Sequence, residues 1–406
     1  MPKYSNIQAK AYVVSSKGSP FVLQDILLDG VQENEVLVEV KYTGICHTVS
    51  APTSLFCQSE QQLMKFQDIV VRDGGMPIGA YPTVLGHEGV GIIREVGKGV
   101  KDKTLYPGDT VLLSFHTCGQ CGPCGERRLG GCLNMTEVNF LTTTRSGNSS
   151  TTPISLPDGT PVHGQFFGQS SMGKLAIVTE NSVVKIDAQP EDLQFLAPLS
   201  CGYLTGAGTV LNVLKPRPTE KVAVLGMGAV GLAALAAAKA VGVETLIAVD
   251  IFDFKLEKAS SVGATHTISS KEFADINAGI RSIFPDGVDK IIDTTGVTSL
   301  LNSSLKALGH EGTLALVGVP SPTALLQVEA LDLLLSCKKI IGVIEGLSDP
   351  KTIIPKLISL YHEKKFPIDK LSTLYPAEDL DRAIADLKSG SIIKPILCWD
   401  SVSSSI

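Results

Sequence analysis

The chain has 406 residues, a length that suits two domains better than one. Hydrophobic residues make up 44% of it and charged residues 19%, which excludes a largely disordered chain. The net charge is -6 and the basic residues are not clustered, so the composition argues against nucleic acid or an anionic membrane as a partner.

The amino-terminal segment and the cysteines indicate the cellular compartment of the protein. The first residues, MPKYSNIQAKAY, lack the basic flank and apolar run of a secretory signal. The longest apolar stretch, residues 222–240, is interrupted by three glycines and Lys239, so we do not expect a membrane span. We expect a cytoplasmic protein, in which the nine cysteines are metal ligands more readily than disulfides.

In chain order, the first 200 residues contain short strand-like runs broken by glycine, such as Val36–Val40, Gly89–Val96 and Thr110–Leu113. Residues 145–152 (RSGNSSTT) are predicted to be a polar loop. From Cys201 the pattern changes to strand-like runs that alternate with helix-like ones: VAVLG, an alanine-rich helix, LIAVD, KLEKASSVG, KIIDTTG and TLALVGV. This alternation predicts βαβ units around a buried parallel sheet.

We therefore predict an α/β protein with a β-rich domain over residues 1–200, a nucleotide-binding domain over 201–351, and a segment, 352–406, that returns to the first domain. The run VAVLGMGAVG gives the pattern G-x-G-x-x-G with Gly226, Gly228 and Gly231. A strand precedes it and a helix follows, which is the arrangement that cradles a pyrophosphate. The next strand ends in Asp250, whose carboxylate can bind both ribose hydroxyls and repel a 2′-phosphate. The pattern predicts NAD as the cofactor. The alternative is a glycine-rich turn beside a solvated acid.

Four cysteines form a compact comb in CGQCGPCGERRLGGC: Cys118, Cys121, Cys124 and Cys132. Four thiolates close a tetrahedral shell around Zn²⁺ and leave no open position, as in a structural site. A disulfide pair or free thiols are the alternative. His116 lies beside the comb and is interpreted as a bystander.

A second set of candidate ligands is dispersed. Cys46 and His47 occur in GICHT, His87 and Glu88 in LGHEGVG, and Cys201 in PLSCGYLTG. Two thiolates and one imidazole would leave a fourth position on zinc for an alcohol oxygen. Taken singly, each residue is equally a small buried cysteine or a hydrogen-bonded core histidine.

These motifs, in this order, resemble the zinc-containing medium-chain alcohol dehydrogenases, and PLSCGYLTGAGTVLNVLKP is most similar to the aryl-alcohol (benzyl alcohol) branch. The resemblance implies a GroES-like catalytic domain, a Rossmann domain and an active site between them. It implies catalytic zinc ligands at Cys46, His87 and Cys201, an acid behind the zinc at Glu88, a proton relay at Thr48, and a contact of His47 with the pyrophosphate. It also implies cofactor contacts at Thr205, Asp250, Lys255 and Val319, with Gly318 beside the last.

The implied activity is hydride transfer between an alcohol and NAD, aided by two zinc ions per chain, in a homodimer or homotetramer. A zinc-free reductase on the same fold and a zinc-ribbon binding module are rivals that the combined motifs disfavour. An enzyme for aliphatic alcohols and a catalytically impaired, NAD-binding relative remain alternatives.

One segment departs from the family. His47 and His87 are forty positions apart, where the family leaves about twenty, and Val49–Gln67 resembles nothing in it. Joining Thr48 to Asp68 gives CHTDIVVRD, which restores both the branch's motif and its spacing. Asp68 would then be the aspartate that supports a ligand histidine. Cys57, within the segment, is interpreted as a free thiol.

Two explanations of the segment compete. Its 19 residues correspond to 57 nucleotides, and its first and last codons can carry the GT and AG of splice boundaries, so we favour a retained intron. The other explanation is a genuine insertion over the substrate entrance. In that case Asp68 must loop back to the site, or the site lacks this support and the enzyme is impaired.

Overall fold

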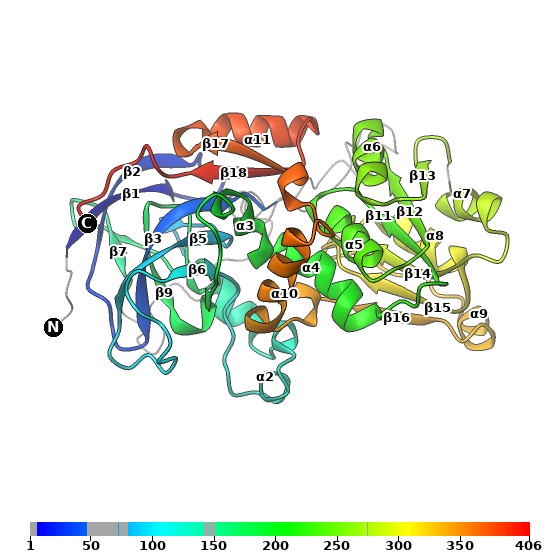
Figure 1. Cartoon of the computed structure of the whole chain (residues 1–406), viewed down its shortest axis with the longest axis horizontal. Coiled ribbons are helices and arrows are strands. Elements are labelled where there is room, and N and C mark those ends of the chain that lie inside the picture. Colours follow the sequence, from blue (N-terminus) through cyan, green and yellow to red (C-terminus); the bar gives the residue numbers. More distant parts are fainter. Residues whose placement is uncertain (1–5, 47–71, 73–79, 142–144, 146–150, 274) are drawn as a thin grey trace.

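A computed structural model describes residues 6–46, 72, 80–141, 145, 151–273 and 275–406 (Figure 1). His47, Thr48, Val49–Gln67 and Asp68 therefore lie outside the described residues, and the predictions made for them stay predictions.

The β-rich part of the chain contains two sheets. One has the order β4-β1-β2-β7-β8, with β1 (Ile7–Val14), β2 (Val22–Leu28), β4 (Thr83–Val84), β7 (Ile154–Ser155) and β8 (Pro161–Val162). The other has the order β10-β6-β5-β3-β18-β17, and β9 also pairs with β3. Its strands are β3 (Glu35–Gly44), β5 (Gly89–Val96), β6 (Thr110–Leu113), β9 (Leu175–Thr179), β10 (Val183–Lys185), β17 (Ser372–Pro376) and β18 (Lys394–Cys398). The strands expected at 36–40, 89–96 and 110–113 are confirmed in β3, β5 and β6.

The third sheet is parallel, with the strand order β13-β12-β11-β14-β15-β16. Its strands are β11 (Lys221–Leu225), β12 (Thr245–Asp250), β13 (His266–Ser269), β14 (Val288–Asp293), β15 (Leu308–Leu316) and β16 (Lys339–Gly342). In sequence order this is 3-2-1-4-5-6, the order of the Rossmann fold, whose ligands bind beyond the carboxyl ends of the strands. The nearly continuous apolar runs of β11 and β12 are buried on both faces, as the parallel arrangement requires.

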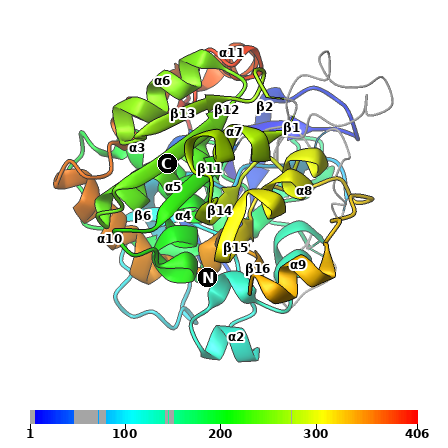
Figure 2. The same cartoon turned by 90° about the vertical axis from the view of Figure 1, so that its right-hand side faces the viewer.

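Helices flank this sheet (Figures 1 and 2). They are α5 (Ala229–Ala240), α6 (Asp253–Val262), α7 (Ile276–Ile283), α8 (Thr298–Ala307) and α9 (Ala330–Leu335). The alanine-rich α5 is almost wholly buried, so the apolar stretch around it is core. Among the described residues, no helix has the length and apolar character to cross a membrane.

Other helices lie beside the two β-rich sheets or between them and the parallel sheet. They are α2 (Gly122–Gly125), α3 (Leu193–Leu196), α4 (Gly202–Gly208), α10 (Pro350–His362) and α11 (Leu380–Ser389). Asp349 caps α10 by accepting from Lys351 N, and Pro350 occupies the first turn, a common helix start. Figure 1 shows α4 and α10 between the parallel sheet and the other two sheets.

The carboxyl-terminal strands return to the first part of the chain. Residues 396–398 of β18 pair antiparallel with residues 42–44 of β3, and β17 pairs parallel with β18. This pairing agrees with a return of the last segment to the β-rich domain, whose boundaries stay a prediction.

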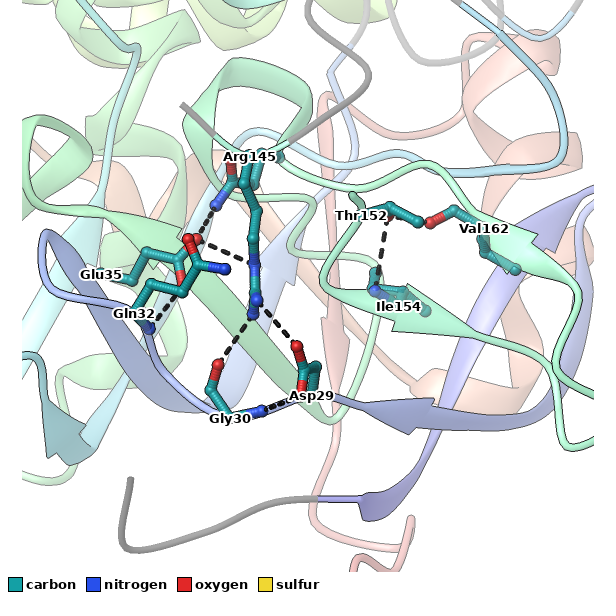
Figure 3. Close-up of polar contacts among 9 residues, drawn as sticks. Asp29, Gly30, Gln32, Glu35, Arg145, Thr152, Ile154 and Val162 are labelled. Atoms are coloured by element: carbon teal, nitrogen blue, oxygen red, sulfur yellow. Dashed lines mark hydrogen bonds and ion pairs between the residues drawn. The ribbon is translucent and has the colours of Figure 1, made fainter. Parts of the chain in front are cut away.

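The predicted polar loop contains a buried cation. The guanidinium of Arg145 is 1% exposed and lies between Glu35, 3.2 Å from its Nε, and Asp29, 2.8 Å from its Nη1 (Figure 3). Nη2 also donates to the carbonyl of Gly30 at 2.9 Å. Arg145 is therefore a packed part of the β-rich domain, which the polarity of its neighbours in the sequence concealed.

Candidate functional site

The three dispersed zinc-ligand candidates meet in one buried cluster. The ligand atoms of Cys46, His87 and Cys201, with a carboxylate oxygen of Glu88, all lie within 4.8 Å of one another. Cys46 follows β3 by two residues, His87 precedes β5 by two, and Cys201 directly precedes α4. Each is at most 5% exposed. Three segments that are distant in the sequence thus meet at one point.

The thiols and the imidazole suit a divalent cation. The contact with Cys201 lowers the pKa of Cys46 well below its usual range, outweighing burial, and the same contact raises the pKa of Cys201. The ring of His87 stacks on Phe167, with centroids 4.6 Å apart, which orients the imidazole. Because thiolate and imidazole are the ligands that Zn²⁺ prefers, this donor set fits zinc.

Behind the cluster lies a fully buried ion pair. Lys394 Nζ is 2.6 Å from Glu88 Oε2, and both side chains are 0% exposed. Glu88 Oε1 also accepts from Gly202 N at 3.1 Å, and Lys394 donates to the carbonyl of Ile45 at 3.0 Å. Burial raises the pKa of Glu88 to about 7 although Lys394 opposes the rise. Burial lowers the pKa of Lys394, but the attraction of Glu88 outweighs it and leaves that pKa above its usual range.

This pair depends on a glycine. A Cβ on Gly44 would lie 2.1 Å from Glu88 Oε2, so the glycine that begins the GICHT motif makes room for the carboxylate. Sequence reasoning missed Lys394. A lysine at the start of the apolar strand β18 is the signal that could have found it, since buried lysines are almost always paired.

The cysteine comb forms the second cluster. The sulfur atoms of Cys118, Cys121, Cys124 and Cys132 all lie within 4.8 Å of one another, around the short helix α2. His116 does not join them: its Nδ1 lies 3.0 Å from Thr179 Oγ1, and burial lowers its pKa to about 4. Four sulfurs around one point fit a closed, structural zinc site.

The glycine motif follows β11, at the carboxyl edge of the parallel sheet. Gly226 has φ +88°, Gly228 caps the start of α5, and a Cβ on Gly231 would lie 1.8 Å from the carbonyl oxygen of Gly226. Asp250 ends β12, and its carboxylate accepts from Met227 N at 2.6 Å and from Phe252 N at 3.0 Å. The acid is thus held against the glycine loop, where a ribose would lie.

The other expected cofactor residues lie in α6, after β15 and in α4. Lys255 is buried, with its Nζ 4.9 Å from the centroid of the Phe252 ring. Val319 is 45% exposed, and a Cβ on Gly296 would lie 2.4 Å from its carbonyl oxygen. Thr205, in α4, donates from Oγ1 to Glu345 Oε2 at 3.1 Å.

Glu345 was not anticipated. It follows β16, is 6% exposed, and its Oε1 lies 3.6 Å from the Sγ of Cys201. Burial raises the pKa of this carboxyl to about 7. Unlike Lys394, Glu345 gives no signal in the sequence, because an acid after a strand is ordinarily solvated.

Comparison with known proteins agrees with this geometry. Residues 32–188 match the alcohol dehydrogenase GroES-like domain and residues 229–363 match the zinc-binding dehydrogenase domain. Geraniol dehydrogenase of Castellaniella defragrans is 34% identical over 97% of this chain and 98% of its own. The chain belongs to the zinc-containing alcohol dehydrogenase family. Its class of activity is therefore alcohol oxidoreduction, and the expected combination of GroES-like and Rossmann folds is confirmed.

Solved structures extend the likeness. The crystal structure of benzyl alcohol dehydrogenase from Acinetobacter calcoaceticus has a TM-score of 0.85 and 37% identity, covering 96% of this chain and 99% of its own. An alcohol dehydrogenase zinc-binding domain protein from Burkholderia ambifaria has a TM-score of 0.87 and 38% identity, covering 96% and 98%.

Proposed function

We propose that this chain oxidises primary alcohols, preferentially aromatic or bulky ones, to aldehydes with NAD⁺. The observation that carries the proposal is the convergence of Cys46, His87 and Cys201 in one buried cluster. The likeness to proteins that are named for geraniol and for benzyl alcohol supports the class of substrate.

The residues of the two cysteine clusters have separate proposed roles. Cys46, His87 and Cys201 would hold the catalytic zinc, and the comb cysteines a structural zinc. When bound, the catalytic zinc supplies Lewis-acid chemistry that lowers the pKa of an alcohol's hydroxyl. Glu88, neutralised by Lys394, adds no net negative charge behind the cluster, and His87 is oriented by its stacked phenylalanine.

The remaining roles concern the proton and the cofactor. Thr48 would pass the hydroxyl proton toward the ribose, and His47 would contact the pyrophosphate, as the family resemblance implies. Asp250 would bind the ribose hydroxyls and disfavour a 2′-phosphate, which makes NAD the proposed cofactor over NADP. When bound, the cofactor would supply the nicotinamide that accepts the alcohol's hydride.

The proposal is tested by metal analysis and by turnover. We expect two zinc ions per chain, and formation of NADH from benzyl alcohol or geraniol with kcat/KM at least about 10-fold above that for ethanol. Substituting NADP⁺ should lower kcat/KM by about 10-fold or more. A chain that binds no zinc, or that turns over only a quinone or an enoyl substrate, contradicts the proposal.

The impaired relative is the second candidate, and it is motivated by the segment Val49–Gln67. A variant that joins Thr48 directly to Asp68 is the matched comparison. If the segment is a retained intron, the joined variant should turn over benzyl alcohol faster than the full chain, by about 10- to 100-fold if Asp68 supports a ligand histidine. Equal rates would support a genuine insertion. Transcript sequencing provides an independent check.

A further inference from the structure

A buried glutamine binds the main chain of the candidate ligand His87. The side chain belongs to Gln169, which is 0% exposed. Its Nε2 donates to the carbonyl oxygens of His87 at 3.0 Å, Leu113 at 2.9 Å and Ser114 at 3.0 Å. Its Oε1 accepts from Gly89 N at 3.3 Å. A single amide therefore joins the ligand-bearing segment that leads into β5 to the end of β6.

The amide is matched to these partners. An amide nitrogen carries two hydrogens, so one of them is shared between two of the three carbonyl oxygens. A buried carbonyl that loses its donor costs free energy, and a carboxylate in place of the amide would offer no donor when ionised. Neither an apolar side chain nor an acid of similar length can therefore replace the amide of Gln169 without releasing the main chain at His87.

The same hydrogen bonds reach a second ligand-bearing segment. Ser114, whose carbonyl accepts from Gln169, donates from its Oγ to the carbonyl of Ser200 at 2.6 Å. Ser200 directly precedes Cys201, and Ser114 and Ser200 are 1% and 0% exposed. Buried polar networks make the groups that they connect more rigid when their members are satisfied. Gln169 and Ser114 thus connect the main chain at His87 to the main chain at Cys201.

The turn that carries Gln169 also orients the ring of His87. The rings of Phe166 and Phe167 lie against the imidazole, with centroids 5.8 Å and 4.6 Å from it. Gln169 follows these two residues after a single glycine, Gly168. Residues of one short turn therefore hold both the ring and the main chain of this candidate ligand.

The backbone of this turn, residues 165–170, is held in an uncommon conformation. Four of its residues have φ in the left-handed region: Gln165 (62°), Phe167 (54°), Gly168 (70°) and Ser170 (51°). Ser170 stabilises the turn, because its Oγ accepts from Phe166 N at 2.9 Å and donates to the carbonyl of Val84 at 2.6 Å. Backbone strain of this kind persists where neighbours enforce it, and it clusters at functional sites.

We propose that Gln169 is a positioning residue for the catalytic metal site: its amide fixes the main chain at His87 and, through Ser114, the main chain at Cys201. Ligands that are already oriented release a bound metal slowly and hold it in one geometry. This role rests on the proposed function, because it requires a metal bound by Cys46, His87 and Cys201.

Metal release and spectroscopy test this role without turnover. We expect Gln169→Met to lose the catalytic zinc to a chelator about 10- to 100-fold faster than the wild type, because a group that orients a ligand histidine is removed. The zinc of the comb should leave at the wild-type rate. With Co²⁺ in the catalytic site, the visible bands report the ligand geometry, and Q169M should shift them. Gln169→Asn keeps the amide but shortens its reach, so it provides the same test if Q169M does not fold.

Gln165→Met is the matched control. Gln165 lies in the same turn, is 2% exposed and has positive φ, but its Nε2 donates to Glu35 Oε1 at 2.9 Å, at the start of β3. Thermal unfolding should show a loss of stability in both Q165M and Q169M, because each change removes a buried amide that donates a hydrogen bond. Only Q169M should change the rate of metal release and the cobalt bands.

The connection to Cys201 is tested by Ser114→Ala. This change removes the hydroxyl that donates to the Ser200 carbonyl and keeps the carbonyl that accepts from Gln169. If the two side chains act through one network, a protein with both Q169M and S114A should release the metal no faster than the faster of the two single variants. Effects that multiply in the release rate would show independent action and would overturn the connection.

The remaining outcomes separate this role from the proposed function. If Q169M and Q169N release zinc at the wild-type rate and keep the wild-type cobalt bands, the positioning role of Gln169 is overturned and the proposed function stands. The same conclusion follows if Q165M changes both measurements as much as Q169M does. If no cobalt enters the cluster of Cys46, His87 and Cys201 in the wild type, the proposed function itself fails.

Discussion

At the scale of single residues, Arg145 shows how a buried cation depends on its partners. Its guanidinium and the carboxylate of Glu35 are 1% and 2% exposed. Burial raises the pKa of Glu35, and the attraction of Arg145 opposes that rise. Removing the arginine would leave a buried carboxyl group without its cation.

We expect Arg145→Met to lower the free energy of unfolding by about 3–5 kcal/mol, measured by urea denaturation. The matched control is Arg128→Met. Arg128 and its partner Glu126 are 52% and 64% exposed, so this change should cost less than about 1 kcal/mol. Adding Glu35→Gln to Arg145→Met should recover part of the loss. If the two arginine variants are equally stable, the buried ion pair contributes no more to the free energy of unfolding than the exposed one.

Asp250 is the residue at which cofactor choice can be tested. Its carboxylate is held against the glycine loop by Met227 N and Phe252 N. We expect Asp250→Asn to raise KM for NAD⁺ by about 10-fold, equivalent to about 1.4 kcal/mol, and to lower KM for NADP⁺. Asp253→Asn, an exposed change three residues later, is the control. An unchanged ratio of the two KM values would show that Asp250 does not select the cofactor.

At the scale of elements, α4 connects the catalytic cluster to the nucleotide-binding sheet. The helix begins directly after Cys201, includes Thr205, and packs against α5 through Gly206. A Cβ on Gly206 would lie 2.0 Å from the carbonyl oxygen of Val230, and a backbone atom cannot move aside as a flexible side chain can. The approach of the two helices therefore depends on this glycine.

We expect Gly206→Ala to lower the free energy of unfolding by about 1–3 kcal/mol or more, and to reduce zinc retention at the catalytic cluster. Gly125→Ala, in α2, is the matched helical control, because its Cβ would meet open space. Thermal unfolding and zinc analysis of both variants provide the check. A G206A protein as stable as G125A would mean that the helices adjust at little cost.

The features that the sequence could predict are those that a single element or a short run of residues encodes. The comb and the glycine motif are local, so their spacing alone indicated a metal site and a phosphate-binding turn. The parallel sheet was predictable because its strands are continuous apolar runs. Lys394 and Glu345 come from segments late in the chain. The apolar residues after Lys394 indicate only that this lysine is buried, and nothing in the local sequence of either residue records the packing that brings it to the cluster.

At the scale of the whole molecule, two segments late in the chain, the turn after β16 and the strand β18, complete the site from both sides. The turn after β16 brings Glu345 to Cys201, and β18 brings Lys394 to Glu88 while it pairs with β3. A site built from such distant parts requires that both domains fold before it forms.

The outer edge of the parallel sheet bears on the homodimer or homotetramer that the family resemblance implies. β16 ends the strand order, and α9 beside it has no buried residues (Figure 2). Its Leu331, Leu334 and Leu335 are 67–71% exposed. An exposed apolar helix beside a sheet edge is typical of an interface between copies of a chain.

We expect sedimentation analysis to give a dimer or tetramer, and Leu331→Asp with Leu334→Asp to shift it toward the monomer, because the charges would have to be buried in the interface. Tyr106→Asp, which alters another exposed residue, on the turn before β6, should leave the assembly unchanged. Binding of NADH should persist in the dissociated variant, since the glycine loop lies beyond the carboxyl end of a different strand, β11. If the two aspartates leave the mass unchanged, α9 is not the interface and its leucines require another explanation.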